Sequence, residues 1–105
     1  MINKTLGLLG ISAKAGKIIA GSEIVIENIK KKKVKLVILA KDSSEKTKKN
    51  IKLLCEQNNI KTVEYGNIEE NSRAIGKQNK AIIGVIDEKL AIAILEKISG
   101  GENFG

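Results

Sequence analysis

The residues best suited to bind a charged ligand lie between positions 15 and 42. Gly16, Lys17 and Gly21 form a glycine-bounded basic turn that opens onto a helix whose N-cap is predicted at Ser22. Glycines let the backbone approach a ligand closely, and a helix start offers free N–H donors at the positive end of its dipole. A cation, glycines and a helix N-terminus together predict a site for a phosphate-rich partner.

This turn does not fit a nucleotide-hydrolysing phosphate loop. The Walker motif places Lys and then Ser or Thr after its second glycine, whereas Gly21 is followed by Ser22 and Glu23. The chain has no histidine and Cys55 is its only cysteine, which excludes zinc sites, acid–base catalysis by histidine and an intramolecular disulfide. We therefore expect a protein that is not an enzyme and needs no cofactor.

The charge of the chain favours a polyanionic partner. Its 105 residues carry 19 basic against 12 acidic side chains, a net charge of +7. Such an excess attracts polyanions through counterion release, although it also keeps many proteins soluble. Tyr65 and Phe104 are the only aromatic residues, which argues against recognition by base stacking on an aromatic platform. The lysine run at 30–33 fits either a phosphate contact or a solvated helix end.

Helices and strands alternate in the segments that must position these residues. Apolar spacing, capping residues and glycines predict helices at 2–13, 22–29, 42–58, 67–76 and 87–98, the last three with N-caps at Asp42, Asn67 and Asp87. Alternating or continuous apolar runs predict strands at 17–20, 35–40, 61–65 and 81–86. The β-branched run at 24–26 would also suit a strand. We favour a helix there, because a strand would leave residues 27–33 without a role.

This order predicts the α/β class, as a three-layer α/β/α sandwich with a small mixed sheet of about four strands. The longest apolar run, residues 36–40, is far below the ~20 residues that a membrane helix needs. The first residues do not have the pattern of a secretory leader. We therefore expect a soluble, cytoplasmic protein that has no membrane partner.

The ordered set of motifs resembles the L7Ae/L30e superfamily of ribosomal proteins, in particular its small bacterial members of the YlxQ-like type. The resemblance covers nearly the whole chain, and it rests on Gly16-Lys17, Gly21, residues 35–42, Ala74-Ile75-Gly76-Lys77 before Ala81-Ile82-Ile83, and the helix end around Cys55-Glu56. It implies an α/β/α sandwich that binds RNA kink-turns, in which a duplex bends sharply at sheared G·A pairs beside a short bulge.

The resemblance also implies which residues bind RNA. In the family, the helix start after the second glycine reads the bend, and a loop before the last strand touches flipped-out bases. The corresponding residues here are Lys17, Gly21, Ser22, Glu23, Ile24, Glu27, Lys31, Ile75, Gly76, Lys77, Gln78, Asn79 and Lys80. Archaeal members place Asn, Glu and Lys where this chain has Glu23, Ile24 and Glu27, so its helix start departs from the best-defined family pattern.

Two functions follow from these observations. The first is a non-enzymatic protein that binds structured RNA, either a kink-turn or ribosomal RNA on the ribosome. It would act as a monomer, with residues 1–99 as a single RNA-binding domain and residues 100–105 as a flexible tail. The alternative is a protein-interaction or assembly module on the same fold with weakened or lost kink-turn recognition, in which Ile24 would be an apolar contact for a protein partner.

Overall fold

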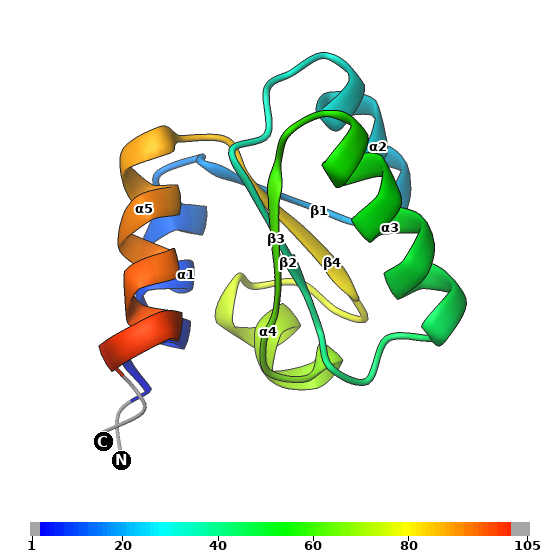
Figure 1. Cartoon of the computed structure of the whole chain (residues 1–105). Helices are drawn as coiled ribbons and strands as arrows, with labels where there is room; N and C mark the ends of the chain where they lie inside the picture. The colour runs from blue at the N-terminus through cyan, green and yellow to red at the C-terminus, as the bar shows by residue number, and fades with distance from the viewer. Residues whose placement is uncertain (1–2, 102–105) are drawn as a thin grey trace.

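One mixed sheet lies between two layers of helices (Figure 1). The computed structural model describes residues 3–101 of the chain. Its strands lie side by side in the order β1 (Ile18–Ala20), β4 (Ile82–Val85), β2 (Leu36–Leu39) and β3 (Lys61–Glu64). β4 runs antiparallel to both β1 and β2, and β2 runs parallel to β3. The predicted α/β/α sandwich with a four-stranded mixed sheet is therefore confirmed.

The helices divide between the two faces of the sheet. α1 (Lys4–Lys14) and α5 (Glu88–Glu96) cover one face, and α2 (Ser22–Lys30) and α3 (Glu45–Gln57) cover the other (Figure 1). The short α4 (Ile68–Ala74) lies against α1 at the edge where β2 ends, and a π-helical turn (Lys97–Gly101) follows α5.

Strand β2 supplies side chains to both layers of the core, since successive residues of a strand point to opposite faces. Leu36 and Ile38 pack in the cluster under α1 and α5, and Val37 and Leu39 pack in the cluster under α2 and α3. All four side chains are buried, which explains why the sequence of this strand is continuously apolar. Cys55 is buried in the second cluster, where burial raises the pKa of its thiol.

Two predicted helix caps are confirmed and two are wrong. Asn67 and Asp87 are the N-caps of α4 and α5, and their side chains accept hydrogen bonds from the N–H groups of residues 70 and 90. Ser22 is the first residue of α2 and the N-cap is Gly21. Asp42 does not cap α3, because Ser44 does so. The Asp42 carboxylate instead accepts from the Ile68 N–H at 2.9 Å, at the start of α4.

The ends of the chain test the predictions only in part. The predicted first helical residue Ile2 and most of the predicted tail, residues 102–105 including Phe104, lie outside the described residues. Gly100 and Gly101 belong to the π-helical turn. None of the helices within residues 3–101 has the length and apolar character needed to cross a membrane.

Two glycines of α1 provide a matched test of how closely this helix packs. A Cβ on Gly10 would lie 2.9 Å from the backbone oxygen of Ala74 in α4, whereas a Cβ on Gly7 would meet no atom within 4 Å. We expect Gly10→Ala to lower the free energy of unfolding by about 1–3 kcal/mol, because it forces the two helices apart. Gly7→Ala should raise it by up to about 1 kcal/mol through helix propensity. Urea unfolding of both variants measures this contrast, and equal effects of the two would contradict it.

Candidate nucleic-acid interface

The N-terminus of α2 differs from the other helix starts in the described part of the chain. The N-caps of α1, α3, α4 and α5 each use a side chain to accept a backbone N–H. The N-cap of α2 is Gly21, which has no side chain, and its φ of 109° is readily adopted only by glycine. The exposed first turn, Ser22 to Ile24, therefore presents backbone donors at the positive end of the helix dipole.

The loop before β4 lies directly beside this helix start. Gly21 donates its N–H to the Ile82 carbonyl at 2.9 Å, which ties α2 to the first residue of β4. A Cβ on Gly21 would lie 3.6 Å from Lys80 Nζ, so the Lys80 side chain extends over the glycine. The structure thus brings together residues 21–24 of the predicted helix start and residues 76–80 of the predicted loop at 75–80.

Ser72 in α4 holds that loop in place. Its hydroxyl accepts the Lys80 N–H at 2.7 Å and lies 3.3 Å from the Lys80 carbonyl as a donor. Its backbone carbonyl accepts the Lys77 N–H at 2.8 Å. Ser72 is only 2% exposed. The sequence analysis missed this residue, since its partner lies eight positions away and no local motif links the two.

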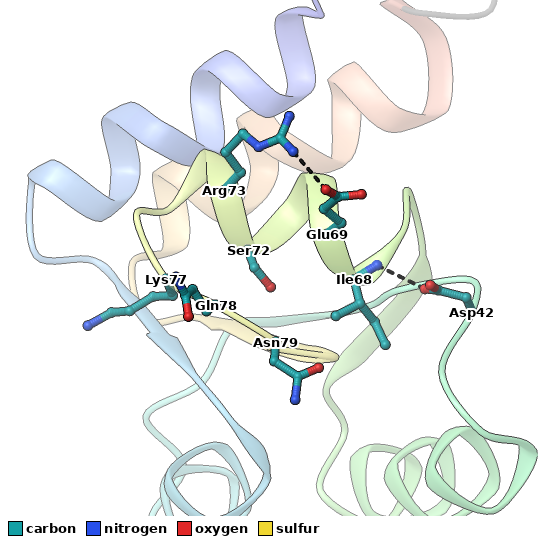
Figure 2. Close-up of a pocket in the computed structure, with 8 residues that line it drawn as sticks. All are labelled: Asp42, Ile68, Glu69, Ser72, Arg73, Lys77, Gln78 and Asn79. Carbon is teal, nitrogen blue, oxygen red and sulfur yellow. Dashed lines mark hydrogen bonds and ion pairs between the residues drawn. The ribbon is translucent and has the colours of Figure 1, made fainter.

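A cleft of about 600 Å³ separates the loop from the start of α4 (Figure 2). Lys77, Gln78 and Asn79 line it from the loop, and Figure 2 shows Ile68 and Glu69 on its other side. Its remaining lining residues are Asp42, Ser72 and Arg73. The Arg73 guanidinium pairs with Glu69 at 2.9 Å. This combination of an apolar wall with amide, carboxylate and cationic groups suits a planar ligand with hydrogen-bonding edges.

Three of the predicted RNA-binding residues lie elsewhere. Lys17 precedes β1 and Gly21 follows it, so the length of that strand, roughly 13 Å, separates them. Lys31 is the C-cap of α2, roughly 15 Å along the helix axis from Gly21. The Ile75 side chain is 7% exposed and packs in the core cluster under α1 and α5. Lys17, Lys31 and the side chain of Ile75 therefore do not belong to the surface that the helix start and the loop form.

Glu27 is neutralised within its own helix. Its carboxylate pairs with Lys31 Nζ at 2.9 Å, and both side chains are exposed. The hydrogen bond from Lys31 and its positive charge lower the pKa of Glu27. The acid that replaces the lysine of the archaeal pattern therefore does not stand as an isolated negative charge beside the helix start.

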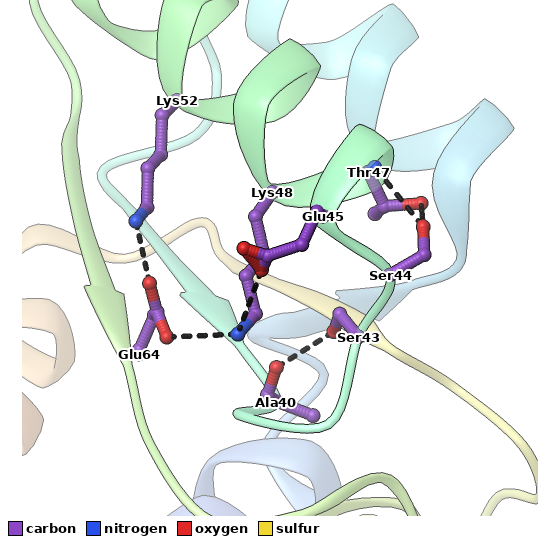
Figure 3. Close-up of polar contacts among 8 residues, drawn as sticks. All are labelled: Ala40, Ser43, Ser44, Glu45, Thr47, Lys48, Lys52 and Glu64. Atoms are coloured by element: carbon purple, nitrogen blue, oxygen red, sulfur yellow. Dashed lines mark hydrogen bonds and ion pairs between the residues drawn. The ribbon is translucent and has the colours of Figure 1, made fainter.

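A similar network occupies two lysines of α3. Lys48 and Lys52 both bind the carboxylate of Glu64 in β3, and Lys48 lies 3.2 Å from it (Figure 3). Hydrogen bonds from Lys52 and then Lys48 lower the pKa of Glu64. At the start of the same helix, the Ser44 hydroxyl accepts the Thr47 N–H at 3.1 Å (Figure 3). These two lysines are therefore partly neutralised by an acid of the sheet.

No group of three histidine, cysteine or carboxylate side chains in residues 3–101 is placed to hold a metal ion. The candidate interface combines lysines, backbone donors and amides, which are groups that bind phosphate and base edges, with the Asp42 and Glu69 carboxylates of the cleft.

Comparison with known proteins places the chain among ribosomal-type proteins. Residues 3–95 match the family described as ribosomal protein L7Ae/L30e/S12e/Gadd45. The RNA-binding protein YlxQ of Enterococcus faecium is 35% identical over 97 residues, which cover 92% of this chain and 93% of the relative. The RNA-binding protein YlxQ of Bacillus subtilis (strain 168) is 33% identical over 87 residues, which cover 80% and 84% of the two chains.

Two solved structures are similar to this one. A protein of unknown function from Bacillus halodurans has a TM-score of 0.90 and 34% identity, and the match covers 93% of this chain and 99% of that one. The Giardia lamblia 15.5kD RNA binding protein has a TM-score of 0.73 and 19% identity, and the match covers 94% and 84%. At that identity, the Giardia structure supports the shared fold alone.

The hydrogen bonds of Ser72 predict how the loop responds to substitution. Ser72→Ala would leave the Lys80 N–H without its acceptor, which we expect to lower the free energy of unfolding by about 1–3 kcal/mol. Ser22→Ala removes an exposed hydroxyl and should change it by less than about 0.5 kcal/mol. Urea unfolding measures both effects, and amide hydrogen exchange at Lys80 should accelerate only in Ser72→Ala. Unchanged exchange at Lys80 in that variant would show that the serine does not hold the loop.

Proposed function

This chain belongs to the ribosomal protein L7Ae/L30e/S12e/Gadd45 family, and from that premise we propose that it binds structured RNA of the kink-turn type. The proposed surface consists of the start of α2, the loop at 76–80 and the cleft beside α4. In this proposal the protein is not an enzyme and acts in the cytoplasm as a monomer, on a kink-turn or on ribosomal RNA within the ribosome. The names of its relatives, which describe RNA-binding proteins, support RNA as the partner.

The observation that carries the proposal is the position of the Lys80 side chain beside Gly21. The Lys80 ammonium lies beside the glycine that begins α2, so a cation, the backbone donors of Ser22 to Ile24 and the helix dipole face one region of solvent. Each of these groups favours a phosphate oxygen. A lysine alone would bind any anion. Because the helix start and the loop are held together, the lysine and the backbone donors can bind the same phosphate in one orientation.

The cleft beside the loop supplies the second part of the proposed contact. Sequence-specific recognition of RNA targets unstacked bases, whose edges are free to form hydrogen bonds. Ile68 offers an apolar surface for a base, and the amides of Gln78 and Asn79 offer a donor and an acceptor each. A flipped-out base of the kink-turn bulge would enter here, while Lys77 and Lys80 contact the backbone beside it.

The helix start itself reads bases weakly in this proposal. Ile24 has no hydrogen-bonding side chain, and Glu27 is paired with Lys31. The loop and the backbone contacts therefore supply most of the affinity. Ile24 also supports the alternative function, an assembly module that binds a protein, because it is an apolar side chain that is 43% exposed on this surface.

The first test removes two cations from the loop. We expect Lys77→Gln with Lys80→Gln to weaken binding to a kink-turn RNA and to reduce the slope of log affinity against log salt by about 1–2, since each phosphate contact contributes roughly 0.7–0.9. The matched control is Lys46→Gln with Lys49→Gln, two exposed lysines of α3. Fluorescence anisotropy titrations at two salt concentrations measure both pairs of substitutions.

The same titrations include an RNA whose sheared G·A pairs are disrupted. Wild-type protein should prefer the intact kink-turn. Equal affinity for both RNAs would overturn kink-turn recognition and leave only a general basic surface. Equal losses in the loop variant and in the α3 control would place the contact away from the loop.

A second test restores the family pattern at the helix start. We expect Glu23→Asn with Ile24→Glu to raise kink-turn affinity by about tenfold or more, because good base-edge contacts contribute roughly 1–3 kcal/mol each. The same affinity titration measures the gain, and the RNA with disrupted G·A pairs should show none. If wild-type protein instead binds a protein partner that Ile24→Glu abolishes, with no gain toward RNA, the alternative function is supported.

A further inference from the structure

Lysines gather at one edge of the sheet, away from the interface of α2 and the loop. Because β4 is antiparallel to its neighbours, β1, β2 and β3 all begin at the same edge. Each of these strands begins with or directly follows an exposed lysine, namely Lys17, Lys35 and Lys61. The lysine run at 30–33, which ends α2 and precedes β2, joins the same edge at the top of Figure 1. We call Lys17, residues 30–33, Lys35 and Lys61 the basic edge.

Backbone hydrogen bonds fix the basic edge. Val85, the last residue of β4, accepts the Lys35 N–H at 2.7 Å, and the Lys17 carbonyl accepts the Ile86 N–H at 2.9 Å. Leu36 is paired in register with Lys61. Lys32 has a φ of 61°, which turns the chain sharply between α2 and β2. Lysines that are distant in the sequence therefore lie at the same edge, at the starts of β1, β2 and β3, with the end of β4 between β1 and β2.

The lysines of the basic edge outnumber the acids beside it. In the part of the chain that the structure describes, the one ion pair at the basic edge joins Lys31 to Glu27. Asp87 and Glu88 stand at the start of α5 after β4, where the Asp87 side chain caps the helix, and Glu56 stands in the last turn of α3 before β3. By contrast, Lys48, Lys52 and Arg73, which lie elsewhere, are each paired with a carboxylate.

The dipole of α2 does not explain the whole cluster. Cations near a helix C-terminus are favourable within its last turn, which accounts for Lys30 and Lys31. Lys17, Lys35 and Lys61 belong to three other segments, and their mutual repulsion does not stabilise the fold of the free protein. A polyanion bound at this edge would neutralise the lysines and relieve their repulsion, which would favour binding.

We propose that the basic edge is a second RNA-binding surface, which contacts the phosphate backbone of a stem that extends from the RNA held at the loop. This inference rests on the proposed function, because the same RNA occupies both surfaces. The length of α2, roughly 15 Å, separates them. The basic edge has only cations to offer, so it recognises charge and not base sequence.

The test compares two sets of three substitutions. The edge variant is Lys32→Asn, Lys33→Gln and Lys35→Gln, with Asn chosen because it tolerates a positive φ. The control variant is Lys4→Gln, Lys46→Gln and Lys49→Gln, which removes the same charge from exposed sites on α1 and α3. Each is titrated with a kink-turn RNA that has a long flanking stem and with one whose stem is cut short, from 50 to 200 mM salt.

On the long RNA, we expect the slope of log affinity against log salt to become less steep by roughly two in the edge variant. The ratio of wild-type to variant affinity should therefore fall roughly tenfold between 50 and 200 mM salt. The control variant should keep the wild-type slope within about half a unit. On the short RNA, the edge variant should bind like the wild type. Preference for intact over disrupted G·A pairs should be unchanged, and the urea midpoint should not fall, because the substitutions relieve repulsion between lysines.

Equal slopes in the edge and control variants would overturn the second surface even if kink-turn preference is intact. Equal losses on the long and short RNAs would also overturn it, because they would indicate a general effect of net charge. Loss of a protein partner in the edge variant, with wild-type RNA binding, would assign the edge to that protein instead. If the wild type shows no kink-turn preference, the proposed function fails, and the slope on the long RNA still tests the edge.

Discussion

The antiparallel pairing of β4 with both β1 and β2 is the constraint on which the rest of the structure depends. Val85 lies opposite Ile18 on one side and Leu36 on the other. Gly84 lets the side chains of Ile19 and Val25 pack closely on β4, since a Cβ there would lie 3.1 Å from Ile19 Cγ1 and 3.5 Å from Val25 Cγ2. The pairing places the loop at 76–80 beside the start of α2 at one edge, and it sends the starts of three strands to the other.

The two edges consequently have different chemistry. At the loop, cations are accompanied by amides, backbone donors and the cleft beside Ile68, so shape and hydrogen bonds restrict what binds. At the basic edge, lysines are the main polar groups, so binding there depends on charge. In the proposed mode of binding, one edge recognises the structure of the RNA and the other attracts its backbone, whereas proteins that stack bases on a sheet combine the two on one face.

The sequence predicted what depends on neighbouring residues. The caps Asn67 and Asp87, the apolar strand at 36–39 and the alternation of elements are local patterns. Contacts between distant segments were not readable in this way. The Asp42 carboxylate accepts the Ile68 N–H of α4 from 26 positions away, Ser72 holds a loop eight positions ahead, and Ile82 of β4 accepts the N–H of Gly21, the cap of α2. The resemblance supplied the helix start and the loop as one surface, but only the direction of the strands separates Lys17 from it.

The burial of Cys55 has a practical consequence for following motions of the protein. It is the only cysteine in the chain, it is fully buried between α3 and the sheet, and its pKa is raised by that burial. A thiol reagent requires the exposed thiolate, so modification has to await the lifting of α3 from β2 and β3. The labelling rate of the natural protein therefore reports the openings, local or global, that expose this layer, and its change on adding RNA would measure how far RNA binding suppresses them.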